Sequence, residues 1–119
     1  MSQSYRDYGA QYFVFAGTKK EFTIIFTDPD TAEPLDMTDS TLFHTATATI
    51  VKSSGEIIGN PVTANYNIDR TTGSLDWIID VDISNNNNAG NWKVEVKLYD
   101  DNGEKIDEQI ANFNILESS

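Results

Sequence analysis

Hydrophobic and polar residues alternate strictly between positions 92 and 99. The hydrophobic positions are Trp92, Val94, Val96 and Leu98, and the residues between and after them are charged or, at the end, a tyrosine. A repeat of two turns one set of side chains toward a buried face and the other toward water, which predicts a half-buried β-strand. This segment is the clearest strand in the sequence.

The residues after this strand predict a hairpin. The segment Asp101-Asn102-Gly103 contains an Asn-Gly pair, which accepts positive φ at both central positions of a type I′ turn. The partner strand is then expected over residues 105–116. Its hydrophobic residues change parity partway along, as one inserted residue would cause, so we expect a β-bulge near Ile110.

Similar alternation predicts the strands upstream. They are expected over residues 22–27, 42–52, 56–59, 62–68 and 75–83, while residues 11–16 form either an edge strand or part of an arm. No long window has helical periodicity with caps. About seven short strands at turn spacings of about ten residues predict an all-β fold, an antiparallel immunoglobulin-like β-sandwich rather than a barrel. Trp77 and Trp92 are expected at the centre of its core.

Four consecutive asparagines lie between two of these strands. Asn side chains bond to nearby backbone groups and tolerate left-handed conformations, so Asn85, Asn86, Asn87 and Asn88, followed by Ala89-Gly90, predict a loop. The simplest interpretation is that they end one strand before the next begins. A second interpretation makes them candidate interface residues, which meet a sugar or a neighbouring subunit.

Length and charge narrow the function classes. A chain of 119 residues without cysteine predicts one domain that is stabilised by packing, without disulfides or thiolate metal ligands. The formal net charge of −11 repels phosphate backbones and anionic lipid surfaces, so no nucleic-acid or membrane partner is expected. The first residues lack the basic start and apolar run of a signal peptide.

The N-terminal dozen residues differ in composition from the rest. Tyr5, Tyr8 and Tyr12 lie among Ser, Gln, Arg and Gly, which is too aromatic for an inert linker and too polar for a core strand. Tyrosine favours interfaces because it buries a large area and keeps a hydroxyl. We therefore expect an arm over residues 1–12 that packs on a neighbour, ahead of one domain over residues 13–119. A frayed tail or an added edge strand is the competing interpretation.

Few residues indicate chemistry. The single histidine, His44, shares strand parity with Ala46 and is expected to point toward the core or its margin. There is no nucleophile elbow and no phosphate-cradling motif, so we expect no catalytic residues and no enzymatic activity. The Asp-rich segments 28–30 and 100–104 could hold Ca²⁺ between loops, but the second does not fit an EF-hand loop because Leu98 falls at the first ligand position. We expect turns there, and no cofactor.

Several segments together carry a family resemblance. In order they are EFTIIFTD, PLDMTDST, IVKSSGEII, GSLDWIIDV, AGNWKVEVKLYDDNGEKI and ANFNIL. Over residues 19–116 this order resembles the small immunoglobulin-like modules of tailed-bacteriophage virion proteins, including baseplate upper protein N-terminal domains and related tail, neck and head-decoration proteins. The segments 34–38 and 89–92 occupy the places of two motifs of these modules, with Met37 in place of Leu and Asn91 as an extra residue.

The resemblance implies a non-enzymatic structural protein of a tailed-phage virion, placed in the tail, baseplate or neck or as a capsid decoration. It would act through protein–protein contacts with other virion proteins and with further copies of itself, and would be located in the virion after assembly in the host cytoplasm. The alternative is a carbohydrate-binding or adhesin-like β-sandwich that uses exposed Trp, Tyr and Asn side chains. Burial of Trp77 and Trp92 would remove the best sugar platforms of that alternative.

Overall fold

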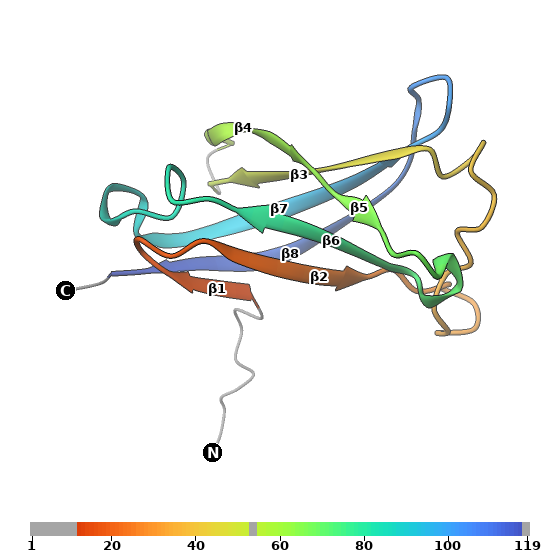
Figure 1. Cartoon of the computed structure of the whole chain (residues 1–119), viewed down its shortest axis with the longest axis horizontal. Helices are drawn as coiled ribbons and strands as arrows, with labels where there is room; N and C mark the ends of the chain where they lie inside the picture. Colours follow the sequence, from red (N-terminus) through yellow and green to blue (C-terminus); the bar gives the residue numbers. More distant parts are fainter. Residues whose placement is uncertain (1–11, 53–54, 118–119) are drawn as a thin grey trace, which may run out of the picture.

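Two β-sheets pack face to face in the computed structural model, which describes residues 12–52 and 55–117 (Figure 1). The larger sheet has the order β1-β8-β7-β3-β4, and the smaller sheet has the order β2-β6-β5. The strands are β1 Tyr12–Phe15, β2 Lys20–Ile25, β3 Thr45–Val51, β4 Ile57–Thr63, β5 Asn65–Tyr66, β6 Ser74–Ile79, β7 Gly90–Tyr99 and β8 Lys105–Leu116, with short 3₁₀ turns η1 Arg70–Thr72 and η2 Asn86–Asn88.

This strand order confirms the predicted immunoglobulin-like β-sandwich. Strands β3, β7 and β8 take the places of C, F and G in one sheet, β4 adds a C′ strand beside them, and β2, β6 and β5 take the places of B, E and D. All paired strands are antiparallel except β1 and β8, which run parallel, with Tyr12 opposite Phe113 and Phe15 opposite Leu116. The parallel pair was not predicted from the alternation.

An aromatic cluster joins the two sheets at the centre of the core. Trp77 of β6 stacks on Phe22 of β2 with ring centroids 4.7 Å apart, and Phe22 meets the edge of Phe113 of β8 at 5.4 Å. Trp77 is 0% exposed and Trp92 is 5% exposed, which confirms the prediction for both tryptophans. The four predicted inward residues of β7, from Trp92 to Leu98, are all buried.

The β7–β8 hairpin forms where predicted, but the prediction of a type I′ turn was wrong. Asn102 does not have a positive φ; only Gly103 does, at 84°. The Asp100 carboxylate accepts hydrogen bonds from the backbone N–H groups of Asn102 and Glu104, each at 2.9 Å, and the Gly103 N–H donates to the Asp100 carbonyl. The carboxylate therefore stabilises a three-residue loop with a left-handed glycine at its end.

The bulge in β8 lies at Ile106 and not near Ile110. Leu98 pairs with Asp107 and Tyr99 pairs with Lys105, so Ile106 is the extra residue, while pairing through Ile110 is uninterrupted. Ile110 is exposed because it points outward in a regular register. The change of parity that suggested an inserted residue near Ile110 therefore arises because Ile110 is a hydrophobic residue on the outer face.

Several predicted strand limits were also wrong. The strand expected over 75–83 ends at Ile79, because the Asp80 carbonyl accepts hydrogen bonds from the N–H groups of Ile83 and Ser84 and so forms a turn. The strand expected over 42–52 begins at Thr45. The break expected between residues 59 and 62 lies inside β4, Ile57–Thr63, and the strand expected over 62–68 is reduced to the two residues of β5 as the chain crosses from the larger to the smaller sheet.

Gly73 lies close to backbone atoms of two other segments. Its φ is 68°, and a Cβ added there would lie 2.5 Å from the Phe26 carbonyl oxygen and 2.9 Å from the Leu35 backbone nitrogen. The Gly73 carbonyl also accepts a hydrogen bond from the Phe26 N–H at 2.8 Å. A side chain at this position would displace the end of β2 and the loop that follows it.

Replacing this glycine tests the crowding. We expect Gly73→Ala to lower the free energy of unfolding by about 3 kcal/mol, because left-handed strain adds to a backbone displacement. The matched control is Gly103→Ala, with φ of 84° and no atom within 4 Å of the added Cβ, which should cost only about 1 kcal/mol. Denaturant unfolding measures both, and equal losses would contradict the close approach at Gly73.

Candidate functional site

Of the three tyrosines predicted as N-terminal interface residues, the structure describes Tyr12. Tyr5 and Tyr8 lie outside the described residues. Tyr12 belongs to β1, where its ring contacts Phe22 at 5.9 Å and Trp77 at 6.0 Å between centroids. It is half-buried, and this burial raises the pKa of its hydroxyl. Tyr12 therefore packs at the margin of its own core.

The four asparagines lie in a loop at one end of the sandwich, as predicted, but they do not end the preceding strand, which stops at Ile79. The Asn85 side-chain amide donates to the Asp82 carbonyl and the Asn88 amide donates to the Ile83 carbonyl, each at 2.9 Å. The Asn88 carbonyl accepts from the Trp92 indole N–H at 2.8 Å. The side chains of Asn85 and Asn88 thus stabilise the loop, and Asn86 and Asn87 are exposed to solvent.

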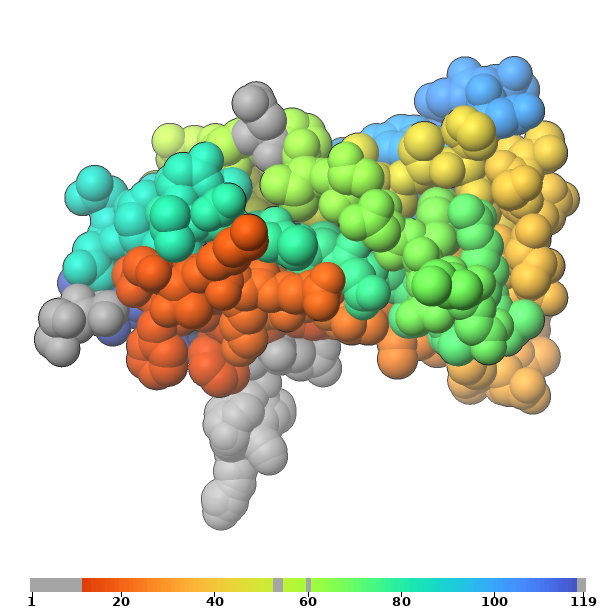
Figure 2. Space-filling view, in the orientation of Figure 1, coloured from red at the N-terminus to blue at the C-terminus, as the bar shows by residue number. Residues whose placement is uncertain are grey.

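This loop lies against the turn between β1 and β2. The Gly17 N–H donates to the Ser84 carbonyl at 2.6 Å, and the Ser84 hydroxyl donates to the Thr18 carbonyl at 2.5 Å. Figure 1 shows both loops at the end of the sandwich that also holds the last residues of β8, and Figure 2 shows them in contact on the surface. The predicted Asn residues and the start of the domain therefore share one end of the molecule.

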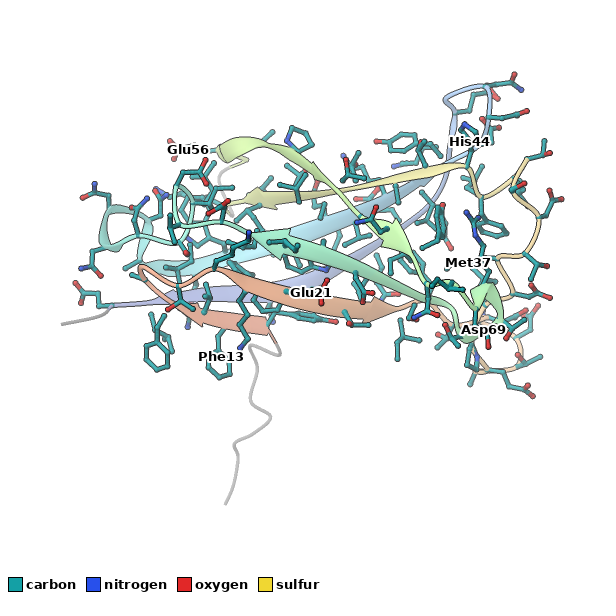
Figure 3. All side chains as sticks on the ribbon, in the orientation of Figure 1. Phe13, Glu21, Met37, His44, Glu56 and Asp69 are labelled. Carbon is teal, nitrogen blue, oxygen red and sulfur yellow. The ribbon has the colours of Figure 1, made fainter. Side chains whose placement is uncertain are left out.

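A pair of exposed aromatic rings lies on β1. Phe13 and Phe15 are 42% and 53% exposed, with their rings edge to face at 6.4 Å. The Lys20 ammonium lies 4.7 Å from the centre of the Phe13 ring, and Figure 3 shows Phe13 on the outer side of β1. Phe13, Phe15 and Lys20 are called the β1 surface below. This surface was not predicted, because in the apolar run YFVF no polar residue indicates which face is buried.

The main chain of β1 offers few free acceptors at this edge. The Phe13 carbonyl accepts from the Lys20 ammonium at 3.1 Å, and the Phe15 carbonyl accepts from the Thr18 N–H at 3.1 Å. Occupied carbonyls and a lysine are devices that keep edge strands from pairing with other chains. Two carbonyl groups on the outer edge of β1 are therefore already occupied within the chain.

A polar hollow of about 300 Å³ lies near the opposite end of the sandwich. It is lined by His44, Thr45, Ala46, Thr63, Ala64, Asn65, Tyr66 and Arg70. The prediction that His44 points toward the core or its margin was wrong: His44 is exposed, because it precedes β3 and the strand parity does not extend to it. Figure 3 shows His44 at the same end of the molecule as Met37 and Asp69.

The two Asp-rich segments are turns in which carboxylates accept backbone hydrogen bonds. The Asp28 carboxylate accepts from the Asp30 N–H at 2.8 Å, and Asp100 stabilises the hairpin loop described above. Within residues 12–52 and 55–117, no three His, Cys, Asp or Glu side chains are grouped so that they could hold a metal ion. The same residues contain no helix long and apolar enough to cross a membrane.

Comparisons with known proteins give no assignment. No model of a protein family matches the sequence, and a search of curated proteins finds no match.

Asp69 caps the short turn η1 that carries Arg70. Its carboxylate accepts from the Thr71 hydroxyl at 2.6 Å and from the Thr71 N–H at 3.1 Å. Both hydrogen bonds lower the pKa of the Asp69 carboxyl, and the bond from the hydroxyl has the larger effect. A lowered pKa means that the ionised carboxyl stabilises the fold above its ordinary pKa, and that this stabilisation is lost as the pH falls through the lowered value.

Removing the hydroxyl tests this cap. We expect Thr71→Val to raise the pKa of Asp69 toward its ordinary value, measured by NMR titration of the carboxyl carbon. The variant should be less stable than the parent at neutral pH, and the difference should shrink in acid, below the lowered pKa. The pKa of Asp36, which Thr38 lowers in the same way, is the internal control and should not move. An unchanged Asp69 pKa would contradict the assignment.

Proposed function

We propose that this chain is a non-enzymatic structural module that acts through protein–protein contacts, and that it is a component of a tailed-bacteriophage virion. The observation that carries the proposal is the β1 surface. Large aromatic residues anchor protein interfaces, since they bury much area at a small entropic cost. Phe13 and Phe15 are the large aromatic residues left exposed in the described part of the chain.

The surroundings of the β1 surface suit a specific contact. Lys20 supplies a cation beside the rings in a chain of net charge −11, so an acidic or apolar partner surface would be favoured there. The turn after Phe15 contacts the asparagine loop through Ser84. Exposed Asn86 and Asn87 can therefore add polar contacts at the border of the same interface, as the second interpretation of these residues requires.

The virion setting rests on the resemblance described in the sequence. In the segment 34–38, which carries one motif of that resemblance, Met37 is buried and the Leu35 N–H donates to the Phe26 carbonyl at 2.9 Å. A strong like-sign charge keeps an assembly protein soluble until it meets its neighbours. Partners are then other virion proteins and further copies of this chain.

The carbohydrate-binding alternative is less well supported. Both tryptophans are buried, so neither indole offers a face to a sugar ring. The exposed aromatic rings of the described residues are the two phenylalanines of β1, which lack the polar group that tyrosine and tryptophan bring to a wet site.

The proposed location in a virion can be tested on purified virus particles. Virus particles purified from a culture that makes the protein should contain it in a fixed ratio to the other virion proteins, measured by quantitative mass spectrometry. Its absence from every particle fraction would contradict the virion assignment.

The double variant Phe13→Ser/Phe15→Ser tests the interface. We expect it to keep the circular dichroism spectrum of the parent and to lose incorporation by at least about tenfold, since two exposed anchors are removed. The matched control is Ile57→Ser/Ile110→Ser, which replaces residues 53% and 52% exposed on other strands. Equal incorporation of both double variants would exclude the β1 surface as the contact.

A further inference from the structure

One nitrogen of the Arg70 guanidinium donates hydrogen bonds within the chain, and one face of the group lies against an aromatic ring. Its Nη1 donates to the Phe43 carbonyl at 2.8 Å and to the Met37 carbonyl at 3.4 Å. The guanidinium carbon lies 4.3 Å from the centre of the Tyr66 ring. The Tyr66 hydroxyl in turn donates to the Thr45 carbonyl at 3.1 Å, which fixes the ring under the guanidinium.

These contacts leave part of the guanidinium without a partner. Arg70 is partly buried, yet within the described residues no carboxylate lies within ion-pair distance of it, and neither Nε nor Nη2 donates a hydrogen bond. The chain has nineteen acidic residues, so acids are not scarce. Guanidinium groups carry five donors in a planar fork, and the two nitrogens without acceptors form one side of that fork.

The hollow beside Arg70 is suited to an anion. Its volume is about 300 Å³, and none of the residues that line it is acidic. His44, Asn65 and the threonines on its walls can each donate a hydrogen bond to an oxygen atom. A local positive charge in a chain of net charge −11 marks this hollow as a place where a negative group is favoured.

We propose that the hollow binds a carboxylate group, held by the free side of the Arg70 fork and oriented by His44 and Asn65. Arg–carboxylate pairs are frequently bidentate, and their charge-assisted hydrogen bonds are stronger than those to neutral acceptors. The carboxylate belongs either to an acidic side chain of a protein partner or to a small free acid. This site lies near the end opposite the asparagine loop and does not depend on the contact proposed for β1.

Binding is tested on the full chain by NMR. Sodium acetate replaces sodium chloride at constant ionic strength, so that general screening does not change. We expect saturable shifts of the Arg70 side chain and of the backbone amides of Asn65 and Tyr66. The capped peptide acetyl-Gly-Glu-Gly-amide should produce the same shifts and its Gln counterpart should not. Shifts with acetate but not with the Glu peptide would overturn the protein-partner source and leave a small acid as the ligand.

Variants separate binding from folding. Arg70→Lys keeps the charge and removes the fork, and should weaken acetate binding by about tenfold or more. Because Arg70 also joins two loops, the rim variants His44→Ala and Asn65→Ala are made as well, and each should weaken binding by about threefold without a change in the unfolding midpoint.

The matched control is Lys93→Gln, an exposed cation on β7 that does not line the hollow, which should bind as the parent does. The proposal is overturned by non-saturating shifts spread over the surface lysines, or by rim variants that bind acetate as the parent does.

Discussion

The stacking of Trp77 on Phe22, with Phe113 against it, is the contact on which the rest of the structure depends. These rings come from β6, β2 and β8, so they join the smaller sheet to the larger one at the centre of the sandwich. Each is nearly or fully buried. Because the chain has no cysteine, this aromatic packing performs the task that an inter-sheet disulfide performs in antibody domains.

The placement of the surface features follows from that core. The inward side chains of β1, Tyr12 and Val14, pack against the cluster, and strict alternation then turns Phe13 and Phe15 outward. At the far end, the crossing of the chain from β4 to β5 positions Tyr66 under Arg70. The two proposed contacts therefore lie on different elements, one apolar and one charged, and can be occupied independently.

Much of the fold could be predicted from the sequence because period-two alternation is a local property. It fixed the faces of β7 and the burial of both tryptophans. It failed where a hydrophobic residue lies outside the core, as at Ile110, and where a side chain decides a turn, as at Asp100. The β1 surface and the Arg70 hollow could not be predicted, since they depend on which strands become neighbours across distant parts of the chain.

The parallel pairing of β1 with β8 has a mechanical consequence. Tyr12 lies opposite Phe113 and Phe15 opposite Leu116, so the chain enters this strand pair at one end and leaves it at the other. Tension applied between the N-terminal and C-terminal sides would slide the two strands along each other and load their hydrogen bonds together, rather than open them one at a time. In this geometry, β1 and β8 would separate by shear, with their hydrogen bonds sharing the load.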